Sequence, residues 1–154
     1  MGLFDGIESA HVGGRGTKLG LGRHLVRITN VKGFGYRKGN GSGLTTTYEV
    51  VISGNAADPV GAVREYMQGV NSDTLGYIVK YAAACLGVDP NNKELVDSQV
   101  RPIVKKTMDA AISTEQLFTG VYLWVQVDEV KDKEDPSKVY ANHSFFPGEA
   151  PKAA

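Results

Sequence analysis

Hydrophobic and polar residues alternate along five stretches of the chain, the pattern of β-strands that bury one face. In the fourth stretch, Leu123 and Val125 fall on one face, whereas Tyr122 and Trp124 fall on the other. The pattern predicts strands at residues 24–31, 44–52, 62–70, 120–128 and 139–146.

Two further segments have the spacing of amphipathic helices. The first covers about residues 73–86; Asn71 or Ser72 can cap its start, and Gly87 permits the left-handed conformation that ends many helices. A second, weaker pattern covers about residues 101–114.

The order of these elements is strand, strand, strand, helix, strand, strand. It predicts a mainly β protein with α-helix, a five-stranded Greek-key barrel of the oligonucleotide/oligosaccharide-binding (OB) type, whose helix connects strands three and four. The residues at 88–119 form a helical insertion before the fourth strand. An open antiparallel sheet with helices on one face is the competing topology.

One domain is expected, because 154 residues suffice for a single hydrophobic core. We expect it to span residues 1–147, with a Gly-rich N-terminal segment at 1–22 and a disordered tail at 148–154. Glycine is also concentrated in a long hairpin loop at 32–43, between the first two strands.

The charge of the chain is balanced overall and uneven along its length. There are 17 Lys and Arg residues against 17 Asp and Glu residues, which excludes a histone-like polycation. Residues 1–54 hold seven basic and three acidic side chains, a net charge of +4, so residues 55–154 have a net charge of −4. Any basic surface is therefore expected near the first two strands.

Residues that support catalysis or metal binding are sparse. His11, His24 and His143 lie far apart, with no neighbouring ligand at metal-site spacing. Cys85, the single cysteine, falls on the apolar side of the first helix and is expected to be a buried thiol. We expect no metal, no cofactor and no enzymatic activity.

The exposed face of the fourth strand holds a pair of aromatic residues. A half-buried sheet usually places polar residues there, so Tyr122 and Trp124 indicate a surface that is covered or used. Aromatic rings on an exposed sheet can stack on unpaired bases. The alternatives are that Trp124 packs under 88–119 and that Tyr122 pairs with Tyr140 or Phe146 across the sheet.

A second set of aromatic and basic residues lies in the predicted hairpin loop. Phe34 and Tyr36 can clamp a strand of nucleic acid, or they can anchor the loop to the barrel. Neighbouring basic side chains can contact phosphates. The predicted DNA-binding residues are Arg27, Lys32, Phe34, Tyr36, Arg37, Lys38, Tyr122, Trp124, Lys131 and Lys133.

Six short motifs, in their order along the chain, give a family resemblance. They are Gly2–Asp5, Leu21–Ile28, Tyr48–Val51, Asp58–Gly61, Cys85–Pro90 and Gly120–Val125. With this layout the chain resembles small phage single-stranded DNA-binding proteins with an OB-like fold. The resemblance implies a protein that coats single-stranded DNA during phage replication or recombination, without sequence preference or catalysis, in the cytoplasm of the infected host cell.

A different class of function is also open. A phage structural or adaptor protein could use the exposed Tyr122 and Trp124 face to form a homo-oligomer such as a dimer. No apolar run approaches the roughly 18 residues of a membrane-spanning helix, so we expect a soluble protein with no membrane partner.

Overall fold

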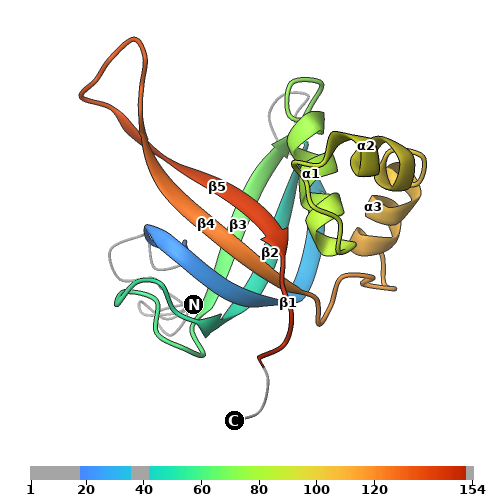
Figure 1. Ribbon diagram of the computed structural model, residues 1–154, viewed down its shortest axis with the longest axis horizontal. Helices are drawn as coiled ribbons and strands as arrows, with labels where there is room; N and C mark the ends of the chain where they lie inside the picture. Colours follow the sequence, from blue (N-terminus) through green and yellow to red (C-terminus); the bar gives the residue numbers. More distant parts are fainter. Residues whose placement is uncertain (1–17, 36–41, 152–154) are drawn as a thin grey trace, which may run out of the picture.

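The computed structural model describes residues 18–35 and 42–151 and shows a mainly β protein with a small group of helices at one side of a curved sheet (Figure 1). The five predicted strands are confirmed. They are β1 (Gly22–Gly35), β2 (Ser42–Ile52), β3 (Val63–Val70), β4 (Tyr122–Lys131) and β5 (Val139–Pro147). The helical elements are α1 (Leu75–Cys85), α2 (Lys93–Leu95), the π-helical turn η3 (Val96–Val100) and α3 (Val104–Ile112).

The strands form one antiparallel sheet in the order β3-β2-β1-β4-β5. The long central strand β1 pairs with β2 on one side and with β4 on the other. Its pairing with β2 shifts between Leu25 and Val26 and again between Ile28 and Asn30. Such bulges bend a strand and increase its twist, which agrees with the strong curvature of β1 in Figure 1.

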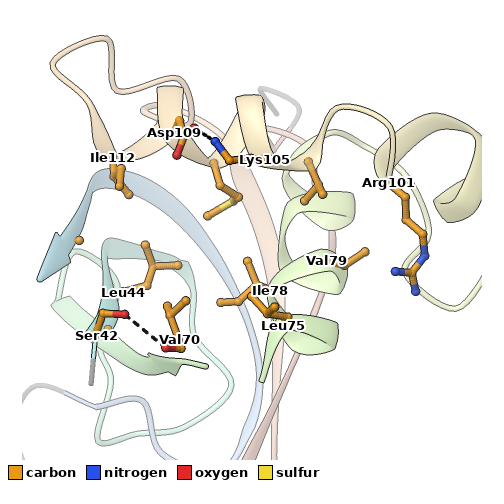
Figure 2. A pocket seen from close by; sticks show the side chains of 14 residues that line it. Ser42, Leu44, Val70, Leu75, Ile78, Val79, Arg101, Lys105, Asp109 and Ile112 are labelled. Atoms are coloured by element: carbon orange, nitrogen blue, oxygen red, sulfur yellow. Dashed lines mark hydrogen bonds and ion pairs between the residues drawn. The ribbon is translucent and has the colours of Figure 1, made fainter. Parts of the chain in front are cut away.

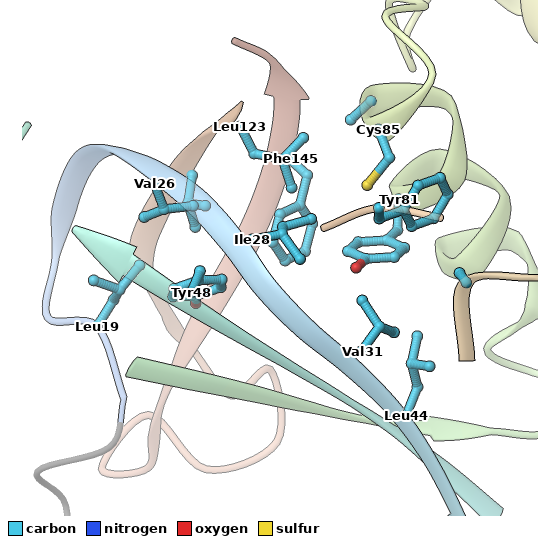
Figure 3. Close-up of a cluster of buried hydrophobic side chains, with 14 of the residues drawn as sticks. Leu19, Val26, Ile28, Val31, Leu44, Tyr48, Tyr81, Cys85, Leu123 and Phe145 are labelled. Carbon is cyan, nitrogen blue, oxygen red and sulfur yellow. The ribbon is translucent and has the colours of Figure 1, made fainter. Parts of the chain in front are cut away.

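The main hydrophobic core lies between the concave side of the sheet and α1, and Figure 3 shows its central side chains. Tyr81 of α1 packs edge-on against Phe118 and Phe145, with ring centroids 6.0 and 5.4 Å apart. Its hydroxyl is hydrogen-bonded to the hydroxyl of Thr46 at 2.8 Å. Cys85 is buried beside it, as the sequence predicts, and burial raises the pKa of the thiol.

The predicted loop at 32–43 is too long, because the two strands continue into it. Lys32 pairs with Thr45 and Phe34 pairs with Gly43, so only residues 36–41 lie between β1 and β2. The glycine-rich pattern predicts a loop there, but glycine does not prevent the backbone from pairing in a sheet. Lys32 and the backbone of Phe34 therefore belong to β1.

The helix predicted at 73–86 is confirmed as α1, but its start differs. Thr74 is the N-cap residue, and the side chain of Asn71 accepts hydrogen bonds from the backbone of Asp73 and Thr74 in the preceding turn. Gly87 ends the helix with φ at +80°, as predicted.

The insertion contains more helix than the sequence pattern indicates. The chain is helical from Lys93, where the side chain of Asn92 accepts a hydrogen bond from the backbone of Leu95 at 3.2 Å. Val96 and Val100 then pack on the Ala82 side of α1 and form a second small core. These short turns bury one residue in four, too few for a periodic pattern to be visible in the sequence.

The N-terminal end of β1 is fastened to the turn that precedes β3. The buried carboxylate of Asp58 accepts a hydrogen bond from the Gly20 backbone and forms an ion pair with Arg64, both at 2.7 Å. The imidazole of His24, also fully buried, donates to the Gly20 carbonyl and accepts from the Gly54 backbone. These bonds fix the register of β1 where its outward side chains begin.

None of the helices in residues 18–35 and 42–151 is long and apolar enough to cross a bilayer. The tail predicted at 148–154 begins at Gly148, whose backbone donates a hydrogen bond to the Tyr122 carbonyl at 3.1 Å.

Candidate nucleic-acid interface

The two faces of β4 divide as the alternation predicts. Leu123 and Val125 are fully buried in the core, whereas Tyr122 and Trp124 are half-buried on the opposite side of the sheet. Strand pairing brings further side chains to that side, since residues directly opposite each other in an antiparallel pair point the same way. We name this surface the aromatic outer face; it consists of Arg23, Arg27, Tyr122, Trp124 and Phe146.

Trp124 lies at the centre of the aromatic outer face. It is opposite Leu25 of β1 and opposite Phe146 of β5. The guanidinium of Arg23 lies 4.9 Å from the centroid of the Trp124 ring and 5.8 Å from that of Phe146. This is the geometry of a cation–π contact, in which the plane of the guanidinium is held while its N–H groups remain able to bind an anion.

Arg27 is the second cation of the face, and it occupies the next outward position of β1 after the one opposite Trp124. It is opposite Tyr122 of β4 and opposite Glu49 of β2. Its guanidinium lies 3.6 Å from the Glu49 carboxylate, and both side chains are about two-fifths exposed. A pair this exposed is weak, on the order of 0–1 kcal/mol, so a phosphate can compete for Arg27.

Both alternatives for the aromatic pair are wrong. The helices of the insertion pack on α1 and beside the end of β1, on the core side of the sheet, so Trp124 does not lie under 88–119. Phe146 is opposite Trp124, not Tyr122, and Tyr140 is opposite Val130.

Sequence reasoning did not include Arg23 and Phe146 among the site residues. Arg23 has the same strand parity as Arg27, and in the Phe145–Phe146 pair alternation sends one ring to the core and the other outward. These two signals were available. What the sequence does not contain is the register that places Arg23 over Trp124.

The other predicted site residues lie in different places. Lys32 is exposed on the outer side of β1, opposite Thr45. Phe34 contributes its backbone to β1, and Tyr36, Arg37 and Lys38 lie outside the described residues.

The remaining two lysines belong to the hairpin between β4 and β5, which projects beyond the rest of the sheet (Figure 1). Lys131 is the last residue of β4, and alternation places it on the opposite side from Trp124. Lys133 lies in the turn, where acidic side chains outnumber the lysines. The hairpin therefore adds little positive charge to the aromatic outer face.

A separate apolar groove of about 950 Å³ lies between α1, α3 and the paired ends of β1 and β2 (Figure 2). Leu44, Val70 and Ile78 are among its walls. The charged residues at its rim are bonded within their own helical turns, as in the Lys105–Asp109 pair at 3.2 Å. The groove thus offers apolar contact with few polar groups directed into it, which does not suit a chain of phosphates.

In comparisons with known proteins, no family model matches the chain, and no curated protein matches its sequence.

Proposed function

We propose that the protein binds single-stranded DNA without sequence preference on the aromatic outer face. The observation that supports this most is the Arg23 guanidinium over the half-buried ring of Trp124, with Phe146 beside it. Unpaired bases stack on such rings, at about 1–3 kcal/mol per base, whatever their identity. Phosphates on the same strand bind the neighbouring arginines.

The charge around the face favours the same ligand. Arg23, Arg27 and Lys32 all lie on the outer side of β1. Of the acidic side chains on the outer side, Glu49 and Glu65 lie on β2 and β3, and Asp128 lies on β4 towards the β4–β5 hairpin. A strand of DNA would therefore cross β1, β4 and β5 beside Tyr122 and Trp124 and avoid the β2–β3 side.

We propose that the curved sheet is an OB-like barrel. Support comes from contacts between its two edge strands: the ring of Tyr66 on β3 lies 4.5 Å from His143 and 5.2 Å from Phe145 on β5. The connection between β1 and β2 and the β4–β5 hairpin then correspond to the two connections that flank the ligand in such barrels. Tyr36, Arg37 and Lys38, with Lys133 of the hairpin, are proposed as further contacts, whereas Lys131 lies on the opposite side from Trp124. The resemblance to phage single-stranded DNA-binding proteins supports a role in coating DNA during replication or recombination, with no catalytic step.

The test is a fluorescence-anisotropy titration with labelled oligo-dT and a duplex of equal length. We expect oligo-dT to bind more tightly than the duplex. Trp124→Ala should weaken oligo-dT binding by about tenfold or more, whereas Lys133→Ala should change it by about twofold or less, because stacking is lost in the first variant only.

Arg23→Ala should also weaken oligo-dT binding, because it removes the guanidinium that lies over Trp124. Arg101→Ala is its matched control, because Arg101 is an exposed arginine that lines the apolar groove and not the aromatic outer face. The proposal is wrong if oligo-dT is not retained at low salt. A mass that rises with protein concentration, without any response to DNA, would instead favour an oligomer built through Tyr122 and Trp124.

A further inference from the structure

A second hollow, of about 450 Å³, lies beside the contact between the two edge strands of the sheet. It opens between β3, β5 and the first turns of α1. This volume lies within the range of small-ligand sites. We name it the seam pocket; the lining residues that matter below are Tyr66, Gln68, Tyr77, Lys80, Asn142 and His143.

Flat rings form the walls of the seam pocket. Tyr66 and His143 lie 4.5 Å apart at an angle of 32°, and Tyr77 is 61% exposed at the mouth. Burial raises the pKa of Tyr66, with a smaller effect from Tyr77, and burial is also the main cause that lowers the pKa of His143. The rings of Tyr66 and His143 are thus uncharged near neutral pH, and both offer a neutral surface to a flat ligand.

Polar groups around these rings can form hydrogen bonds with the edge of a base. The amides of Gln68 and Asn142 each present a donor and an acceptor, and none of the hydrogen bonds among the described residues uses them. Amides of this kind pair with base edges. β3 and β5 are also the edges of the sheet, so backbone N–H and C=O groups face the same space.

A cation stands at the mouth of the seam pocket. Lys80 is exposed on α1, and none of the ion pairs in the described part of the chain involves it. Its ammonium is therefore available to a phosphate. Phe146 both lines the pocket and lies beside Trp124 on the aromatic outer face, so the two surfaces are continuous.

From this arrangement we propose that the seam pocket takes one unpaired nucleobase from the bound strand, stacked against Tyr77 and Tyr66, with its polar edge on the amides of Gln68 and Asn142 and its phosphate near Lys80. The inference rests on the proposed function. It adds a point of base preference to an otherwise indiscriminate surface, because rings accept any base and amides do not.

The experiment compares labelled oligo-dT, oligo-dA and oligo-dC of equal length with wild-type protein and two variants. Tyr77→Ala should weaken binding of all three by about tenfold, because a stacking ring is lost. Asn142→Ala should change the ratio of the three affinities by about threefold or more while the aromatic outer face is intact. Leu75→Ala is the matched control, since it lies on the same helix, is 51% exposed and lines the apolar groove.

Two outcomes separate this inference from the function on which it rests. If Trp124→Ala weakens binding while Tyr77→Ala and Asn142→Ala keep the wild-type affinities and their ratio, the seam pocket holds no base and the proposed function stands. If the wild-type protein binds none of the three oligonucleotides, both are wrong. Both variants alter exposed side chains, so an unchanged thermal midpoint is expected and checks that each is folded.

Discussion

At the scale of single residues, hydrogen-bond partners separate side chains that look alike in the sequence. Tyr48 and Tyr81 are both buried in the core. The hydroxyl of Tyr81 is bonded to Thr46 at 2.8 Å, whereas that of Tyr48 has no protein partner among the described residues. Nothing in the sequence tells which of the two hydroxyls is paired.

This difference predicts unequal effects of removing the two hydroxyls. Tyr81→Phe should lower the free energy of unfolding by about 1–2 kcal/mol, because it leaves the buried hydroxyl of Thr46 without its partner. Tyr48→Phe is the control and should cost less. Urea denaturation followed by circular dichroism measures both, and an equal loss in the two variants would contradict the assignment.

Glu49 is predicted to oppose DNA binding, because its carboxylate lies 3.6 Å from the guanidinium of Arg27. Glu49→Gln should strengthen oligo-dT binding by about threefold, since it frees Arg27 and removes a negative charge from beside the path of the phosphates. Glu94→Gln makes the same change of net charge on the exposed helix α2. An equal gain in both variants would mean that only net charge matters.

At the scale of elements, the strands were predictable and the short helices were not. Period-two alternation marks a strand wherever one face is shielded from solvent: β2 and β4 alternate buried with half-buried residues, and β3 alternates half-buried with exposed ones. The segment at 93–100 is helical because Asn92 caps it and because Val96 and Val100 pack on α1, a tertiary contact that no local pattern contains. The loop at 32–43 was predicted too long for the related reason that strand pairing overrides glycine.

The turn before β3 is also a tertiary feature, and its ion pair is predicted to matter for stability. The Asp58 carboxylate is only 2% exposed and the Arg64 side chain 15%. Asp58→Asn should lower the free energy of unfolding by about 2–4 kcal/mol, because it leaves a mostly buried cation without its partner.

Asp97→Asn removes one member of an exposed ion pair with Arg101 and is the matched control. It should cost about 0.5 kcal/mol or less. Chemical denaturation of the two variants gives the comparison. A loss at Asp58 no larger than that at Asp97 would show that the turn does not hold β1 in place.

At the scale of the whole molecule, the balance of 17 basic and 17 acidic residues hides a one-sided distribution. The sequence indicated a basic first third, and the structure places Arg23, Arg27 and Lys32 on one side of β1. The cations of the candidate site could thus be found from the charges along the chain and from the alternation of strand residues. The contact of Arg23 with Trp124 and Phe146, in contrast, depends on the pairing of β1, β4 and β5.

A neutral protein with a few cations on one face should show a moderate salt dependence. Three described cations on the outer side of β1, with those of the adjoining loop, predict a slope of about −2 to −4 for the logarithm of the binding constant against the logarithm of salt concentration. Oligo-dT titrations at several salt concentrations measure it. A slope near zero would show that the arginines bind no phosphate, which would contradict the proposal.

The central claim is that a single strand lies on the aromatic outer face, and the fluorescence of Trp124 tests it most directly. Trp124 is the single tryptophan of the chain, so the emission reports this face and no other. Oligo-dT should quench it in a saturable way, with the midpoint found by anisotropy of the same labelled strand. If the strand binds and the emission of Trp124 does not change, the DNA lies elsewhere and the account is wrong.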